Sequence, residues 1–161
     1  MVNVRLAKIS ELDALLSIYE RARVLMRNSG NPNQWKSNYP DESVVTADIN
    51  AGCLYVVEED DVVHGVFMFA KGPDPTYFEI EGNWLNSDSY HVIHRVASAG
   101  TKKGFLRDCL VYALSVSNNI KIDTHKENSI MRHQLQKLGF KECGIITLKS
   151  GDKRIAYQLT V

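Results

Sequence analysis

The stretch Arg95–Leu106, RVASAGTKKGFL, does most to limit the folds open to this chain. Residues 91–97 have the character of a strand, a short loop with two glycines and two lysines follows, and apolar residues at helical spacing begin after Gly104. A helix that starts directly after such a loop exposes unpaired backbone N–H groups and the positive end of its dipole. Glycine lets a bound group approach the backbone closely. The stretch therefore predicts a strand–loop–helix unit with an anion site at the start of the helix.

Taken alone, this loop has a second interpretation. It also fits an ordinary turn between a strand and a helix, in which Lys102 and Lys103 are simply solvated. It is not a P-loop, which requires Gly-x-x-x-x-Gly-Lys-Ser/Thr. The rest of the chain has to decide between the two interpretations.

The remaining segments predict an α/β protein. Ser10 and Asn128 are candidate helix N-caps, and residues 71–89 form a looser segment that carries three large aromatic side chains. No repeat or linker interrupts the pattern, so residues 1–161 are expected to form a single domain. Strands are expected near residues 3–7, 54–57, 62–70, 91–97, 120–124, 140–148 and 153–160, and helices over 10–28, 41–51, from 104 to about 116, and 128–138.

Charge and composition exclude several classes of protein. The 19 basic and 19 acidic side chains cancel, which argues against nucleic acid as a main partner. Residues 1–5 lack the apolar core of a signal peptide, and no apolar run reaches membrane-spanning length. Cys53, Cys109 and Cys143 are scattered and odd in number, as is typical of reduced thiols. We therefore expect a cytoplasmic protein without a membrane partner.

A second stretch, Asn128–Phe140 (NSIMRHQLQKLGF), gives the loop its meaning. Together the two stretches resemble the GNAT acetyltransferase superfamily, in which a strand, a glycine-rich pyrophosphate loop and a helix precede a second strand and a helix of the pattern Asn-x-x-Ala…Tyr-x-x-x-Gly-Phe. Asn128, Lys137, Gly139 and Phe140 match that pattern, and Val63–Gly65 resembles an earlier strand that ends in Val-Gly. The order of elements agrees over essentially the whole chain, and the motifs fall within about residues 92–145.

The resemblance implies a fold and a donor. The fold would be a mixed, mostly antiparallel sheet flanked by helices on both faces. The activity would be transfer of an acetyl group from acetyl-CoA to an amine, by direct attack in a ternary complex and without a metal. The residues that would contact acetyl-CoA are Val96, Ala97 and Ser98 on the strand, Thr101, Lys102, Lys103, Gly104 and Phe105 in the loop and helix start, and Asn128 and Met131 on the later helix.

The chain departs from the family pattern in two places. The loop keeps only Gly104 of the usual Arg-x-x-Gly-x-Gly/Ala, with Thr101 and Leu106 at the other matched positions. Leu135 stands where many members carry a tyrosine that protonates the leaving thiolate. The general acid is therefore left open.

An attacking amine must lose a proton, so a base is expected near the thioester. His94, on the predicted strand, and Glu81, in the segment before it, are the two candidates. A packed histidine and a solvated glutamate are the alternatives. Trp35, Tyr77 and Trp84 lie in predicted loops and are candidate contacts for the acceptor, with core packing as their alternative.

A metal site is not expected. His91 and His94 are three apart on a predicted strand and so face opposite sides, and His125 and His133 lack His-Glu-x-x-His spacing. The sequence leaves open a non-catalytic acyl-CoA-binding or interaction module on the same fold, an unrelated nucleotide-binding α/β domain, and a homodimer. The acceptor, a small molecule or a peptide amine, is not determined.

Overall fold

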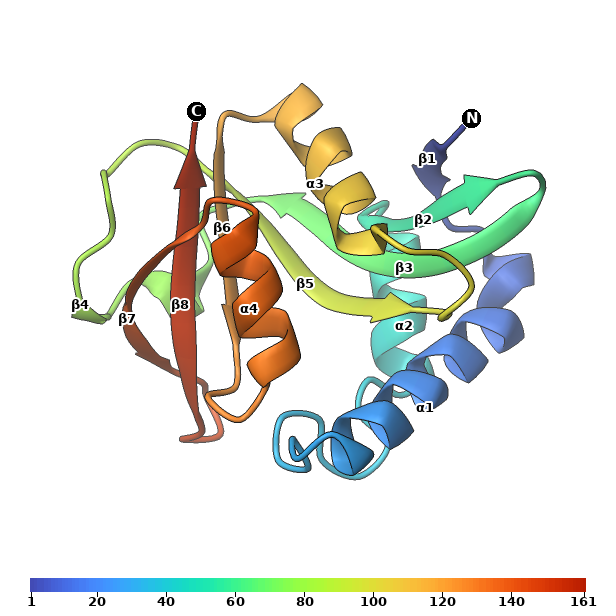
Figure 1. Ribbon diagram of the computed structural model, residues 1–161, viewed down its shortest axis with the longest axis horizontal. Coiled ribbons are helices and arrows are strands. Elements are labelled where there is room, and N and C mark those ends of the chain that lie inside the picture. Colours follow the sequence, from blue (N-terminus) through green and yellow to red (C-terminus); the bar gives the residue numbers. More distant parts are fainter.

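The computed structural model describes all 161 residues and contains one eight-stranded sheet with helices on both faces (Figure 1). The strand order is β1-β2-β3-β5-β6-β8-β7-β4, and only β5 and β6 run parallel. The expected fold class is confirmed. The strands are β1 (Asn3–Leu6), β2 (Leu54–Glu59), β3 (Val62–Lys71), β4 (Glu81–Gly82), β5 (His91–Ser98), β6 (Asn119–Thr124), β7 (Lys141–Thr147) and β8 (Lys153–Thr160). The helices are α1 (Leu12–Asn28), α2 (Glu42–Asn50), α3 (Phe105–Val116) and α4 (Ser129–Lys137), with 3₁₀ turns at Ile9–Glu11 and Pro75–Tyr77.

Two sequence expectations about local structure are wrong. Ser10 does not cap α1, because it lies inside the 3₁₀ turn that precedes the helix. The segment 71–89 is not only loop, since it contains a 3₁₀ turn and the short strand β4. Its buried aromatic residue Tyr77 packs on the sheet with Val92 and Ile146, and this packing organises the segment.

Each face of the sheet is covered by different elements. Helices α3 and α4 bury a core of 14 residues on one face, including Phe67, Ile93 and Leu135. Helices α1 and α2 cover the other face over β2, β3 and β5, around Tyr19 and Val56. Beyond them the segment 71–90 covers the same face over β5, β8 and β7. No helix is both long enough and apolar enough to cross a bilayer.

The middle of the sheet opens where β5 and β6 part. Their parallel ladder contains only His91 with Ile120 and Val92 with Lys121. After these pairs the strands diverge, while β5 stays bonded to β3 as far as Ser98. Figure 1 shows the gap between β5 and β6, with α3 and α4 in front and the end of α1 below. An edge of β5 beyond Val92 therefore has no partner strand.

Candidate active site

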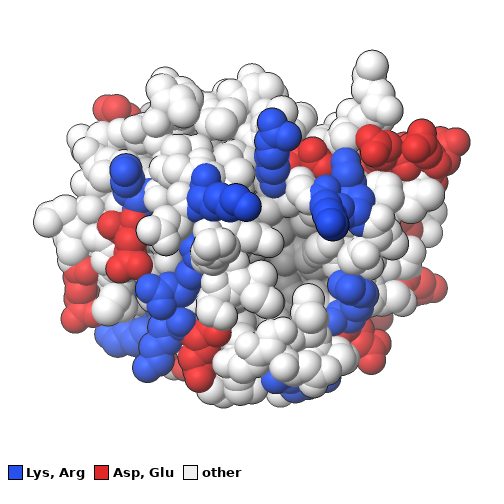
Figure 2. Space-filling view, in the orientation of Figure 1, with Lys and Arg blue, Asp and Glu red and all other residues white.

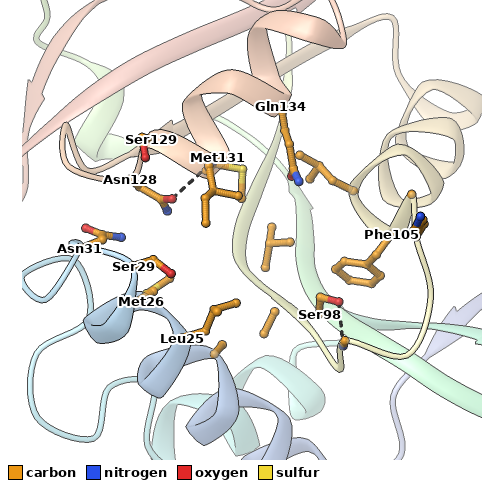
Figure 3. Close-up of a pocket in the computed structure, with 18 of the residues that line it drawn as sticks. Leu25, Met26, Ser29, Asn31, Ser98, Phe105, Asn128, Ser129, Met131 and Gln134 are labelled. Carbon is orange, nitrogen blue, oxygen red and sulfur yellow. Dashed lines mark hydrogen bonds between the residues drawn. The ribbon is translucent and has the colours of Figure 1, made fainter.

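The gap beside β5 holds a cavity of about 720 Å³, which we name the β5 cavity. Its walls come from α1, from the end of β5 with the following loop and the start of α3, and from α4. Figure 3 shows Leu25 and Met26 of α1 facing Met131 and Gln134 of α4 across it. The apolar walls and the unpaired edge of β5 suit an extended ligand that has amide groups, because such a ligand can hydrogen-bond like a neighbouring strand.

Glycine and a helix start form one end of the cavity. Gly104 is the N-cap of α3 and has φ +77°, a conformation that side chains with a Cβ rarely adopt. No neighbouring atom would meet a Cβ at this position, so the space before the helix is open. The first N–H groups of α3 thus face an accessible position, as the sequence predicted.

The rim of this cavity is cationic although the chain has no net charge. Lys103, Arg107 and Lys137 line it together with Arg21, whose guanidinium donates to the carbonyl of Ser98 at 3.2 Å. Glu127 is the one acidic residue in the lining. Figure 2 shows basic side chains around the hollow on this face. The arrangement favours an anionic ligand.

The two lysines of the loop are not equivalent. Lys102 is held by the carboxylates of Asp108, at 2.9 Å, and Glu59, at 3.6 Å. These carboxylates raise its pKa, with the Asp108 hydrogen bond as the main cause. Lys103 has no such partner. Of the two, Lys103 is therefore better able to meet an anion.

A bulge in β5 shapes the wall of the cavity. Arg95 and Val96 together face a single residue of β3, and Arg95 has φ +49°. Three groups hold this strained residue. The buried hydroxyl of Tyr19 donates to the carbonyl of Arg95 at 2.8 Å, and Asp48 accepts two bonds from its guanidinium, at 2.6 and 2.8 Å. Tyr39 accepts a third bond at 3.2 Å.

His94 lies just before the bulge and faces the side of the sheet covered by the segment 71–90. Its Nε2 is 2.8 Å from a carboxylate oxygen of Asp74, and its Nδ1 is 3.7 Å from Asp123. Asp123 also accepts a 2.6 Å bond from the hydroxyl of Tyr77. Continuing the register of the β5–β6 ladder places His94 level with Asp123, so the two side chains meet across the gap where backbone pairing has ended.

Charge effects agree with this geometry. The hydrogen bond from His94 lowers the pKa of Asp74. Burial, together with the neighbouring Asp123, raises the pKa of Tyr77 well above its usual value. Tyr77 is therefore a neutral donor, and the two aspartates hold the imidazole from both of its nitrogens.

Nine of the ten residues expected to contact acetyl-CoA line the β5 cavity. The exception is Thr101, whose hydroxyl lies 2.6 Å from the ring of His64. The nine are Val96, Ala97, Ser98, Lys102, Lys103, Gly104, Phe105, Asn128 and Met131. The side chain of Asn128 also caps α4, accepting from the N–H of Met131 at 3.1 Å.

The other residues singled out in the sequence lie in different parts of the structure. Glu81 lies on the edge strand β4, beyond β8 and β7, with its side chain 72% exposed and 3.9 Å from Lys153. Trp35 packs against Tyr19, and Trp84 packs against Tyr77. Leu135 is fully buried in the core under α3 and α4, so it does not reach the cavity.

Sequence reasoning missed two parts of the site. One is the wall from α1, including Arg21 and Asn31, which is 2% exposed and keeps a buried oxygen without a partner. The other is the aspartate pair around His94. Of the two aspartates, only Asp123 could have been found from the sequence, because it lies within an alternating strand pattern. No group of histidine, cysteine or acidic side chains is arranged to hold a metal ion.

Comparison with known proteins identifies the fold. No family model matches the sequence, and no curated protein does. A GNAT-family acetyltransferase from Streptococcus agalactiae is 29% identical, with a TM-score of 0.90 over 99% of this chain and 95% of that one. A Staphylococcus aureus protein assigned as an acetyltransferase is 26% identical, with a TM-score of 0.72 over 98% and 97%. A GNAT-family acetyltransferase from Bacillus cereus, 22% identical with a TM-score of 0.65 over 99% and 97%, shares the fold.

These structures match nearly the whole length of the chain. The chain has the fold of the GNAT superfamily of acyl-CoA N-acyltransferases and is similar to GNAT-family acetyltransferases over nearly its whole length.

Proposed function

We propose that the protein transfers the acetyl group of acetyl-CoA to an amine acceptor by direct attack in a ternary complex. The observation that carries this proposal is the position of His94 and its two aspartates at the point where β5 and β6 part, beside the β5 cavity. A donor in the cavity and an acceptor on the opposite face of the sheet would meet there.

The residues of the β5 cavity fit acetyl-CoA. The N–H groups at the start of α3 and the side chains of Lys103 and Arg21 suit its phosphates. The free edge of β5 suits the amides of its arm, with Met131 and Leu25 packing on the arm. The buried oxygen of Asn31 lacks a donor that an amide of the arm could supply. Acetyl-CoA itself supplies an activated thioester carbonyl.

His94 would take the proton that the amine loses as it attacks. Asp74 and Asp123 would orient the imidazole and stabilise it once it is protonated. A backbone N–H near the bulge at Val96 would stabilise the developing negative charge on the thioester oxygen. Holding donor and acceptor together supplies much of the rate, so no covalent enzyme intermediate is needed.

A non-catalytic acyl-CoA-binding module on the same fold is a second candidate, because the buried Leu135 replaces the usual tyrosine. Two measurements separate the candidates. Calorimetry with CoA and acetyl-CoA tests the cavity, and thiol release from acetyl-CoA with a panel of amines tests transfer. Binding with amine-dependent thiol release supports the enzyme, and binding without it supports the module. If neither CoA nor acetyl-CoA binds at millimolar concentration, both candidates fail.

A further inference from the structure

A second cavity, of about 400 Å³, lies where the chain segment after α1 meets the end of β6 and the β7–β8 hairpin. We name it the basic cavity, because Lys36, Lys126, Lys153 and Arg154 line it. Asp152 is the only acidic residue in the lining, and Lys36 already contacts its carboxylate at 3.3 Å. The cavity therefore has an excess of positive charge that nothing in its walls neutralises.

Arg154 is the most unusual member of this group. It is only 6% exposed, and its guanidinium donates to two backbone carbonyls, those of Gln34 at 2.8 Å and Lys153 at 2.9 Å. No carboxylate lies within ion-pair distance of it, although Asp123 and Asp152 are near enough to oppose the lowering of its pKa by burial. A buried cation without an anion is costly, and a ligand with a negative charge would offset that cost.

The positive charge of Arg154 also acts on a neighbouring histidine, His125. His125 lines the cavity, and its pKa is lowered, first by burial and then by the charge of Arg154. Glu127 and Asp152 act in the opposite direction, and Lys126 adds to the lowering. Burial and the nearby guanidinium of Arg154 thus both disfavour a further proton on His125.

The basic cavity adjoins the β5 cavity through Gln34. The side-chain oxygen of Gln34 accepts bonds from Asn128, on the rim of the β5 cavity, at 2.9 Å and from the hydroxyl of Thr124 at 3.2 Å, while its carbonyl accepts from Arg154. A single loop therefore separates the two cavities.

Strand pairing brings Arg154 towards His94. Asp123 is opposite Ala156 in the β6–β8 ladder, so Arg154 is its diagonal neighbour on the same face of the sheet. Such neighbours are about 7–8 Å apart. A small molecule whose amine lies at the aspartate pair could therefore place a second group against the buried guanidinium of Arg154.

We propose that the acceptor is a small molecule that carries a carboxylate as well as the reacting amine, and that the basic cavity binds this carboxylate. The assignment rests on the proposed function, because it names the class of acceptor for that site. The amine lies at Asp123 and His94, and the carboxylate lies against Arg154, Lys126 and Lys153. A guanidinium with free N–H groups is well suited to a carboxylate.

The test compares amino acids with their carboxamides, which keep the amine and lose the negative charge. With acetyl-CoA as donor, kcat/KM for the acids should exceed that for the amides by about tenfold or more. The variant Lys126→Gln/Lys153→Gln should remove most of this preference, and Lys149→Gln should not. Lys149 is an exposed lysine on the same hairpin that does not line the cavity.

A binding measurement decides the matter if no member of the panel is acetylated. N-acetyl amino acids and their amides are titrated into the protein with and without CoA, and the acids should bind more tightly to the parent but not to the double variant. Equal binding of acids and amides, or no binding, overturns the assignment. So does a preference for phosphoethanolamine over every amino acid. A failure of CoA to bind is a separate result, which counts against the proposed function.

Discussion

The β5 cavity and the basic cavity are built in different ways. The β5 cavity takes most of its lining from two continuous stretches, 96–107 and 127–138, with α1 as the third wall. The basic cavity takes its lining from short pieces at 33–36, 125–126, 145 and 152–155, which no motif connects. Local spacing therefore carries the information for the first cavity, and chain crossing creates the second. The variants below test whether the reaction takes place between the two.

The largest effect is expected at His94, which stands between the two cavities. His94→Ala should lower kcat by roughly 10²–10⁴. The dissociation constant of CoA should change little, because the imidazole lies on the face of the sheet proposed for the acceptor and does not line the β5 cavity. Glu81→Gln is the matched control and should keep parental turnover, since Glu81 lies on the far edge strand. Steady-state kinetics and calorimetry measure both. If folded His94→Ala keeps parental kcat, solvent takes the proton and the base assignment fails.

Gly104→Val tests the loop end of the β5 cavity. A side chain at φ +77° costs about 1–2 kcal/mol, which would correspond to roughly a fivefold to thirtyfold loss of CoA affinity if the loop has to keep this shape. Gly52→Val is the control, because Gly52 has φ +68°, equally open surroundings and no place in the cavity. Both variants should lose stability, and only Gly104→Val should weaken CoA. Equal affinities in the two variants would mean that the loop does not hold the phosphates.

Leu135→Tyr tests whether α4 presents this position to the core. The larger side chain enters a filled core, so the free energy of unfolding should fall by about 1–3 kcal/mol. Gln134→Tyr, one residue earlier, should barely change stability but should weaken CoA by occupying the cavity. Denaturant unfolding and calorimetry separate the two outcomes. A Leu135→Tyr protein that is as stable as the parent would show that this position has room for the tyrosine seen in other family members.

The smallest effect is expected from the two loop lysines. Lys103→Ala should weaken CoA a few-fold at low salt and less at high salt, because its charge is exposed at the rim and is screened by ions. Lys102→Ala should change CoA affinity less, because Asp108 and Glu59 already neutralise that ammonium. The comparison is made by titration at both salt concentrations. The reverse order of effects would mean that binding CoA breaks the ion pairs of Lys102.

The sequence alone determined most of the helices and strands and pointed to two of the three walls of the β5 cavity. Strands alternate every two residues and helices repeat every three to four, so Phe105–Val116 and Asn119–Thr124 are evident without any distant contact. The same holds for Gly104 before α3 and Asn128 before α4, because a helix end is completed by residues within a few positions of it. The family resemblance carried by these short motifs implied the fold class and nine of the residues that line the β5 cavity.

Only the tertiary structure decided which distant side chains meet. The sequence offers Glu81 and His94 as two candidate bases, and only strand order puts Glu81 at the edge of the sheet and His94 at the gap. Asp74 reaches His94 because Tyr77 anchors the segment 71–90 on the sheet, and Arg154 is buried because the segment after α1 crosses over it. Helical spacing puts Met131 and Leu135 on the same face of α4, and only the packing shows that Leu135 is fully buried in the core while Met131 also lines the cavity. These contacts depend on burial and pairing between segments that are far apart in the chain, which local spacing does not encode.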